Sequence, residues 1–494
     1  MNDNLLSIDQ GTTSTRAIIF KSNGVPLSIH QLDLKNYYPH SGWVEQDPEE
    51  IWQNTVLCCR EALRKSKLNV SQIAGVGITN QRETTIIWNK NTSKPIAKAI
   101  VWLDRRTVDI CRELSKLSIN SLLQNKTGLI LDPYFSATKI IWLLENVKYA
   151  REFVDKGELA FGTIDTFLLW RLTNGRSHST DATNASRTLL FNIRSQEWDN
   201  DILKAFKIPK IILPKVLDCS SDFGYVDEKI LGGTIPISGI AGDQQAAAVG
   251  QACFNPGMVK STLGTGCFML MNTGSKLIKS NNKLLSTVAY RLDNKVTYGL
   301  EGTIFSAGVT IKWLRDKLKI IKTAAETESL ANNCHDTGGI YVVPGFSGLG
   351  APYWDPDAKG ALLGLTASSS IPQIVRAALE SVCYQSKDLL MAMYSDSRAP
   401  LELLRVDGGM AANNWLLQFL SDILSLNVQR PSCIETTAQG AAYLAGLQIG
   451  VYKSLDEISS LWRINSEFIP QMIESKVIHL YSGWKEAVSR VLTK

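Results

Sequence analysis

The chain has 494 residues, of which 44% are hydrophobic and 20% are charged, with a formal net charge of +5. This length exceeds what one hydrophobic core usually organises, so we expect at least two domains, and the composition excludes wholesale disorder. The net charge is mild and no block of Lys and Arg stands out, which argues against nucleic acid or an anionic membrane as a partner.

The cysteines and the first residues indicate the compartment. The nine cysteines are odd in number and form no CxxC pair, and Cys58 and Cys59 are adjacent within a probable helix. This usage is typical of a reducing compartment. MNDNLLSID has no basic n-region, and no run of about 18 apolar residues suggests a membrane span. We therefore expect a cytoplasmic protein.

The opening stretch LLSIDQGTTSTRAIIF, residues 5–20, consists of two apolar runs separated by Gly11 and hydroxyl residues. This pattern predicts a strand, a turn and a second strand. Asp9 is negatively charged, so an anion bound at this turn would lie beside it only if a cation separated the two. An ordinary hairpin whose polar residues merely satisfy the turn is the alternative. The turn is rich in hydrogen-bond donors and is therefore suited to binding phosphate. These donors belong to Thr12, Thr13, Ser14 and Arg16.

Helix-like and strand-like segments alternate after this hairpin. EEIWQNTVLCCREALRKS follows Asp-Pro and predicts a helix, IAGVGIT predicts a strand, and WLDRRTVDICREL leads into another helix. The alternation indicates an α/β protein. Arg82 and Glu83 come in a turn after IAGVGIT and offer donors and an acceptor together, although such a neighbouring pair is commonly only a solvated surface pair.

The second half of the chain repeats the opening pattern. FNPG at 254–257 is a candidate domain junction, and it is followed by VKSTLGTGCFMLMN, whose turn spans Gly264–Gly266. Two like domains, each with a phosphate-binding hairpin facing a shared cleft, would hold a nucleoside triphosphate from both sides. Coincidence is the alternative, because the repeated stretch is short. No Gly-Lys pair and no GxGxxG after a strand is present, so a nucleotide would have to bind through the hairpins.

A third glycine turn lies in LLRVDGGMAANNWLLQFLSDIL. The segment predicts a strand, a turn and an amphipathic helix capped by Asn413 or Asn414. Gly408 and Gly409 would let the backbone approach a flat ligand such as adenosine. A simple connection between a strand and a helix is the alternative.

Together these motifs carry a resemblance that runs from Ile8 to about Leu447. The chain resembles the FGGY family of carbohydrate kinases, and within it the members that phosphorylate glycerol. The likeness implies two actin-like (ribonuclease H-like) ATPase domains, residues 1–253 and 254–494, with ATP and glycerol in the interdomain cleft, and a homo-oligomer. The motifs are DQGTTS, NQRETT, DPYFSATK, GIAGDQQAA, STLGTGCFML, GLGAPYWDP and DGGMAANN.

The resemblance also implies site residues. Asp243 is similar to the family's catalytic base, and Asp9 is the expected anchor of Mg²⁺. Lys312 stands where related bacterial enzymes often carry Gln. The implied glycerol contacts are Arg82, Glu83, Tyr134, Asp243 itself and Gln244, with Trp102 and Phe268 along the carbon edge of glycerol. The implied nucleotide contacts are Thr12, Thr13, Ser14, Arg16, Thr265, Gly308, Lys312, Gly409 and Asn413.

Three other readings of the sequence stay open. One is a related kinase acting on a longer polyol, which would need a roomier pocket than Trp102 and Phe268 suggest. Another is an actin-like ATPase without a metabolite substrate, and a third is an inactive binding module, against which Asp9 and Asp243 argue. In regulation, no basic residue follows Thr234, so we expect fructose 1,6-bisphosphate to inhibit weakly or not at all.

Overall fold

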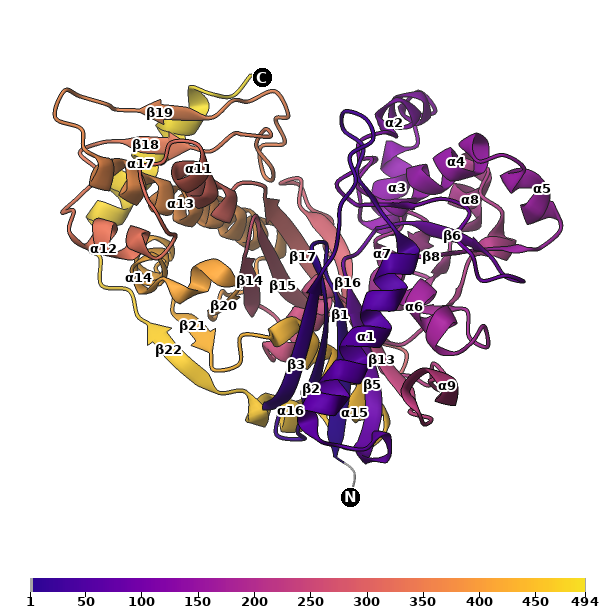
Figure 1. The fold of residues 1–494 in the computed structure, drawn as a ribbon. Helices are drawn as coiled ribbons and strands as arrows, with labels where there is room; N and C mark the ends of the chain where they lie inside the picture. Colours follow the sequence, from indigo (N-terminus) through magenta and orange to yellow (C-terminus); the bar gives the residue numbers. More distant parts are fainter. Residues whose placement is uncertain (1–2, 494) are drawn as a thin grey trace.

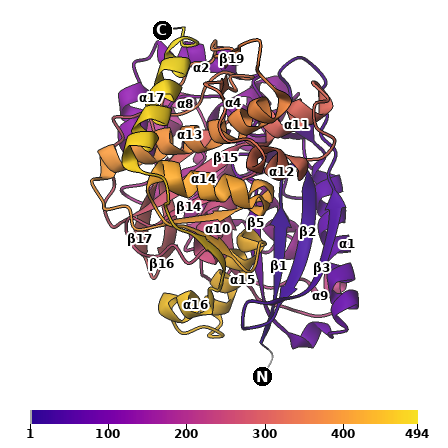
Figure 2. The ribbon, with the colours of Figure 1, turned by 90° about the vertical axis from the view of Figure 1, so that its left-hand side faces the viewer.

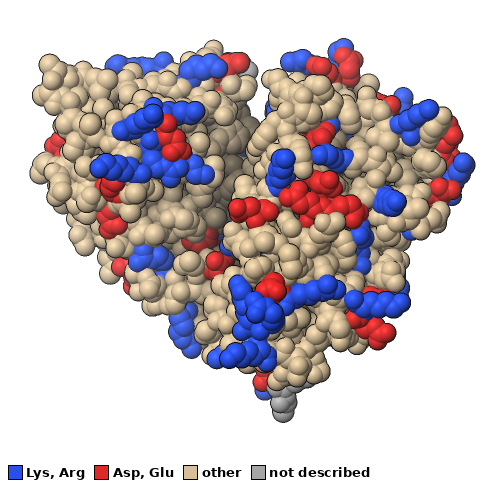
Figure 3. All heavy atoms as spheres, viewed as in Figure 1, with Lys and Arg blue, Asp and Glu red and all other residues tan. Residues whose placement is uncertain are grey.

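The computed structural model describes residues 3–493 and consists of two lobes, each built on a β-sheet (Figure 1). The first half of the chain forms most of the lobe at the right, and the second half forms the lobe at the left. Figure 3 shows a notch between the two lobes, with acidic and basic side chains on both. Each helix among the described residues is too short or too polar to traverse a lipid bilayer.

The sheet of the first half has five strands in the order β13-β5-β1-β2-β3. β1, β2 and β3 are antiparallel neighbours, whereas β5 and β13 are parallel to β1. The predicted opening hairpin is therefore confirmed, as is the strand predicted for IAGVGIT. The bounds are β1 (Asn4–Gln10), β2 (Ser14–Phe20), β3 (Pro26–Asp33), β5 (Ile73–Asn80) and β13 (Ile237–Gly242).

The sheet of the second half contains the same arrangement. Within the order β16-β17-β15-β14-β20-β21-β22, β17, β15 and β14 are antiparallel neighbours, and β20 and β21 are parallel to β14. The predicted second hairpin is thus β14 and β15, in the sheet positions that β1 and β2 occupy. The bounds are β14 (Val259–Leu263), β15 (Cys267–Gly274), β16 (Leu285–Leu292), β17 (Lys295–Ile304), β20 (Leu404–Asp407), β21 (Val428–Pro431) and β22 (Ile464–Phe468).

Two helices join the halves at the base of the molecule. α10 (Asp243–Gly250) packs against α15 (Thr436–Gln448), which also contacts β5, β13 and β1 (Figure 1). The helices approach so closely that a Cβ on Gly440 would lie 1.8 Å from the carbonyl oxygen of Ala246. The close approach fixes the start of α10, where Asp243 lies, relative to both sheets.

Helices cover the outer faces of both sheets. The predicted helix after Asp-Pro is α1 (Pro48–Ser66), and the Asp47 carboxylate caps it by accepting from the N–H of Glu49. α1 packs against β2 and β3. Figure 2 shows α13, α14 and α17 on the other lobe, where α13 (Ile371–Ser397) contacts α14 (Asn414–Leu424) and α17 (Glu474–Ser489).

The remaining elements complete the two lobes. In the first half they are β4 (Glu45–Gln46), β6 (Ile86–Asn89), β7 (Ala99–Ile100), α2 (Val108–Ser115), α3 (Asn120–Thr127), α4 (Ser136–Asn146), α5 (Ala150–Asp155), β8 (Leu159–Gly162), α6 (Ile164–Leu172), β9 (Ser179–Asp181), α7 (Ala182–Ser186), β10 (Phe191–Asn192), β11 (Glu197–Trp198), α8 (Asn200–Phe206), β12 (Lys215–Leu217) and α9 (Glu228–Leu231). In the second half they are α11 (Gly308–Asp316), α12 (Glu326–Asn332), β18 (Tyr341–Val343), β19 (Ala361–Leu363) and α16 (Leu455–Leu461).

Candidate active site

The turn between β1 and β2 is closed by a hydrogen bond from the N–H of Gly11 to the carbonyl oxygen of Ser14, at 2.9 Å. Thr12 and Ser14 are partly exposed and Thr13 is exposed, so their hydroxyl and N–H groups remain accessible. The hydroxyl of Thr12 already accepts a hydrogen bond from Trp102 Nε1 at 2.9 Å. This bond ties the turn predicted to bind phosphate to an aromatic side chain predicted to contact glycerol.

Asp9 lies at the end of β1 and is 4% exposed. Arg16 pairs with Asp9 at 3.0 Å and with Glu435 at 2.6 Å. Burial raises the pKa of Asp9, Arg16 lowers it, and the charges of Glu435 and Asp243 raise it further, to about 6. A buried carboxylate among other carboxylates is suited to a cation.

The carboxylate of Asp9 fits a magnesium ion whose other ligands are mainly water and the phosphates of a bound substrate. Mg²⁺ usually keeps several waters and binds through one or two carboxylates and substrate phosphates. Residues 3–493 contain no cluster of three or more His, Cys, Asp or Glu side chains arranged to hold a metal. Asp9, at the end of β1 beside the first turn, is a residue that could hold such an ion.

Arg82 forms the centre of a buried polar cluster. Its Nε lies 3.1 Å from Asp243 Oδ1, and its Nη1 and Nη2 donate to the two carboxylate oxygens of Glu301 at 2.5 and 3.0 Å. The Arg82 side chain is 2% exposed, whereas that of Asp243 is 31% exposed. The arginine is thus fixed, and the aspartate beside it is open to a ligand.

Glu83 is held by a second buried arginine. Arg187 Nε donates to Glu83 Oε1 at 2.6 Å, and Arg187 Nη2 lies 3.1 Å from Glu301 Oε1, within ion-pair distance although outside hydrogen-bond geometry. Glu83 has φ of 64°, a backbone conformation that non-glycine residues rarely adopt. Its carboxylate is therefore anchored from two directions, by its backbone and by Arg187.

Three aromatic rings line the same region. The Trp102 ring centroid lies 5.6 Å from that of Tyr134 and 6.2 Å from that of Phe268, both edge to face. Phe268 follows the second turn on β15. These rings come from three separate segments, and they form an apolar wall of the kind that the carbon edge of a small polyol needs.

Two buried lysines hold predicted ligand residues in place. Lys260 Nζ contacts Gln244 Oε1 and donates to Thr262 Oγ1 at 3.1 Å. Lys139 Nζ donates to the carbonyl oxygens of Pro133 and Tyr134 at 2.6 and 2.7 Å, and to that of Phe135 at 3.1 Å. Neither Lys139 nor Lys260 is measurably exposed. Each is paired with the segment that presents a predicted glycerol contact.

The second turn opens onto a cavity of about 480 Å³. Lys312 Nζ lies 3.5 Å from Thr265 Oγ1 at its edge, and Asn413 caps α14 by accepting from the N–H of Leu416 at 2.9 Å. A Cβ added to Gly409 would meet nothing within 4 Å, so this glycine leaves the cavity open. Five predicted nucleotide contacts line the cavity, namely Thr265, Gly308, Lys312, Gly409 and Asn413.

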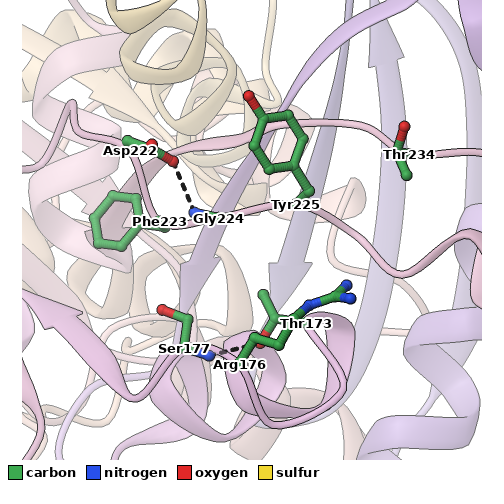
Figure 4. Close-up of a pocket in the computed structure, with 8 residues that line it drawn as sticks. All are labelled: Thr173, Arg176, Ser177, Asp222, Phe223, Gly224, Tyr225 and Thr234. Carbon is green, nitrogen blue, oxygen red and sulfur yellow. Dashed lines mark hydrogen bonds between the residues drawn. The ribbon is translucent and has the colours of Figure 1, made fainter.

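A second hollow, of about 580 Å³, lies away from this site and includes Thr234 (Figure 4). Arg176 lies at its edge, with a side chain that is 61% exposed and 3.4 Å from Asp227. The Asp222 carboxylate on the opposite segment accepts from the N–H of Gly224 at 2.9 Å. The hollow thus presents one cation that is already paired and one carboxylate.

The structure brings the predicted glycerol residues together with the first turn, and it places five predicted nucleotide residues around the cavity at the second turn.

Four residues of the site were not predicted from the sequence, although all four contact predicted residues. They are Glu301, Arg187, Lys139 and Lys260. Glu301 gave a signal, since it is the one carboxylate in the strand KVTYGLEGTI. The missed Lys260 is a similar case, as the one charged residue in the largely buried strand VKSTL.

Comparison with known proteins identifies the relatives of this chain. Residues 4–250 match the N-terminal domain model of the FGGY family of carbohydrate kinases, and residues 259–449 match its C-terminal domain model. A glycerol kinase of Coxiella burnetii (strain RSA 331) is 58% identical over 494 residues, which is 100% of this chain and 98% of that protein. Glycerol kinase 1 of Pseudomonas aeruginosa is 56% identical over 99% of both chains.

Solved structures show the same fold. The crystal structure of Plasmodium falciparum glycerol kinase with ADP superposes with a TM-score of 0.94 at 39% identity, over 100% of this chain and 99% of that one. A ligand-bound xylulose kinase of Lactobacillus acidophilus superposes with a TM-score of 0.88 at 21% identity, over 99% of this chain and 98% of that one. The expected two-part actin-like ATPase fold is confirmed.

Proposed function

The chain belongs to the glycerol kinases of the FGGY family of carbohydrate kinases, and from that premise we propose that it transfers the γ-phosphoryl group of ATP to a terminal hydroxyl of glycerol. The products are ADP and sn-glycerol 3-phosphate. The observation that supports this most strongly is the meeting of Arg82 and Asp243 at 3.1 Å beside the aromatic wall and the first turn. The site combines directional polar groups with the apolar wall of three aromatic rings.

Glycerol is uncharged, so its orientation depends on hydrogen bonds to its hydroxyls. In our proposal Arg82 and Gln244 donate to these hydroxyls, and Glu83 accepts. The rings of Trp102 and Phe268 contact the carbon edge. We expect this wall to leave less room for a longer polyol, which favours glycerol over larger sugars.

Asp243 acts as general base in the transfer. As the terminal oxygen of glycerol forms its bond to the γ-phosphorus, the bond from that phosphorus to the bridging oxygen of ADP breaks, and the hydroxyl proton passes to the Asp243 carboxylate. The side chain is 31% exposed, so a hydroxyl can reach it, and its Oδ1 lies within ion-pair distance of Arg82 Nε, at 3.1 Å. The guanidinium fixes the carboxylate without occupying it fully.

The nucleotide is held by both hairpins. We assign the adenosine end to the cavity of about 480 Å³ and the phosphates to the two turns, with Arg16 beside the first. Mg²⁺ at Asp9, when bound, neutralises charge on the phosphate oxygens. Closing the two lobes around both substrates would exclude water as a competing acceptor.

The proposal extends to domain boundaries and assembly. We place the boundary at residue 254, between α10 and β14, so that residues 1–253 and 254–494 carry one phosphate turn each. A homo-oligomer is what the relationship suggests, and light scattering after size exclusion measures it.

A coupled assay of ADP release tests the activity. The purified protein is given Mg-ATP with glycerol, dihydroxyacetone, erythritol or xylulose. We expect the highest kcat/KM with glycerol. Preference for xylulose or erythritol would assign a different kinase activity, and ATP hydrolysis that ignores every polyol would remove the kinase assignment.

A further inference from the structure

Glu301 is a buried carboxylate contributed to the site by the second half of the chain. It lies on β17, an interior strand, with Leu270 and Leu285 as its neighbours on the adjacent strands. It is 0% exposed, and the two cations beside it, Arg82 and Arg187, both come from the first half. A single anion therefore faces two arginines across the line between the halves.

The geometry shows what this anion does to Arg82. Both terminal nitrogens of the guanidinium donate to Glu301, and Nη1 also donates to Gln245 Oε1 at 3.2 Å. Nε lies 3.1 Å from Asp243 Oδ1, within ion-pair distance although outside hydrogen-bond geometry. The stem of Arg82 is also fixed, because a Cβ on Gly242 would lie 2.7 Å from its Cγ and Cδ. With its stem packed and both terminal nitrogens bound to Glu301, the guanidinium has its position set by that carboxylate, and Gln245 is a second acceptor on Nη1.

The negative charge of Glu301 supports the same effect on Arg82. Burial alone would raise the pKa of Glu301, but Arg187 and Arg82 outweigh it and lower the pKa to about 2. The residue is therefore an anion throughout the physiological range. Without its charge, Arg82 and Arg187 would be two buried cations sharing only Glu83 and Asp243, and Arg82 would be drawn onto the carboxylate that the reaction needs free.

We infer that Glu301 is a positioning residue that orients the Arg82 guanidinium, and through it Asp243 and Glu83, for glycerol. The inference rests on the proposed function. It predicts an effect confined to the glycerol side of the site, because Glu301 contacts none of the residues assigned to the nucleotide.

The test compares Glu301→Gln with Glu301→Asp and with Asp388→Asn. Asp388 is a matched control: it is also buried in the second half, it accepts from Tyr353, Tyr481 and Trp484, and it lies outside the site. We expect Glu301→Gln to lower kcat and raise KM for glycerol, each by about 10- to 100-fold, with KM for ATP unchanged. Glu301→Asp keeps the charge and should recover part of the loss. Asp388→Asn should lower Tm and leave both KM values unchanged.

Each outcome decides a separate claim. Wild-type protein that is inactive on glycerol would remove the proposed function, whatever the variants do. An active wild type with unchanged kinetics in Glu301→Gln, or with equal increases in KM for glycerol and ATP, would overturn the positioning role. If Glu301→Gln does not fold, Glu301→Asp carries the test, because wild-type kinetics in that shortened side chain would also contradict it.

Discussion

At the scale of single residues, the site depends on side chains whose partners are buried and far away in sequence. Asp243 and Arg82 are separated by 161 positions, since 243 minus 82 is 161, and the fold brings them within 3.1 Å. Lys139 shows the same principle. It stabilises a segment only because three carbonyl oxygens converge on its ammonium group.

Replacing Lys139 by Met should destabilise the protein and weaken glycerol binding. The change leaves three buried carbonyl oxygens without their donor, and such groups cost about 1–3 kcal/mol each when unsatisfied. We expect a loss of about 3 kcal/mol or more in the free energy of unfolding, and a raised KM for glycerol because Tyr134 lies on this segment. Urea unfolding and steady-state kinetics measure both. The exposed Lys148→Met is the control, and equal behaviour of the two variants would contradict the assignment.

At the scale of elements, buried contacts between neighbouring strands and helices contribute to stability. His178 precedes β9, and its Nε2 is 2.8 Å from the carbonyl oxygen of Phe161 on β8. Burial lowers the pKa of His178 to about 4, with smaller opposing and assisting effects of the Phe161 carbonyl and Lys90. The ring is packed against Trp88 and Trp170, so it stays neutral in the folded protein.

The His178 shift predicts how stability depends on pH. Between pH 6.5 and 4 the unfolded chain binds a proton at this position and the folded chain does not, so stability should fall as the pH falls through this window. The lowered pKa of His178 corresponds to a change of about 3 kcal/mol at most in the free energy of unfolding. Urea unfolding at pH 7 and pH 5 of the wild type and of His178→Gln should show a smaller pH effect in the variant. An unchanged pH effect would show that other groups cause it.

The contact between α10 and α15 can be tested with a pair of glycines. Gly440→Ala would place a Cβ 1.8 Å from the Ala246 carbonyl oxygen, so we expect a loss of about 3 kcal/mol in the free energy of unfolding. Gly409→Ala adds a Cβ into open space and should leave Tm unchanged, while raising KM for ATP because the methyl group enters the cavity. Similar Tm values for the two variants would contradict the close packing.

Much of the element-scale structure could be predicted from the sequence. Both hairpins, α1 with its Asp47 cap and α14 with its Asn413 cap follow from local chemistry. The residues that hold the site could not be predicted in this way. Glu301 and Arg187 matter through a contact between distant segments, and no turn or periodic pattern indicates which buried arginine a strand carboxylate will meet.

At the scale of the whole molecule, the repeated sheets explain why two glycine turns serve one site. Each half places its hairpin at the same position in its sheet, and α10 and α15 hold the halves together at the base. The second hollow lies outside this arrangement. Among the described residues that line it, Arg176 is the only cation, and it is paired with Asp227.

This hollow supports the expectation for fructose 1,6-bisphosphate. Two phosphate groups there would meet one shared arginine and the Asp222 carboxylate, so we expect weak inhibition or none. Initial rates with glycerol and Mg-ATP, measured over increasing bisphosphate, test this, with sulfate at matched ionic strength as the control. A saturating inhibition curve in the micromolar range would contradict the prediction.

In the proposed reaction Asp243 takes the proton of glycerol while separate loops hold the nucleotide. Asp243→Asn keeps the size of the side chain and removes its basicity. The most direct measurement combines kcat with ATP affinity for wild type and Asp243→Asn. We expect Asp243→Asn to lower kcat by about 10²–10⁴-fold and to retain the affinity for ATP. Turnover close to that of the wild type would contradict it.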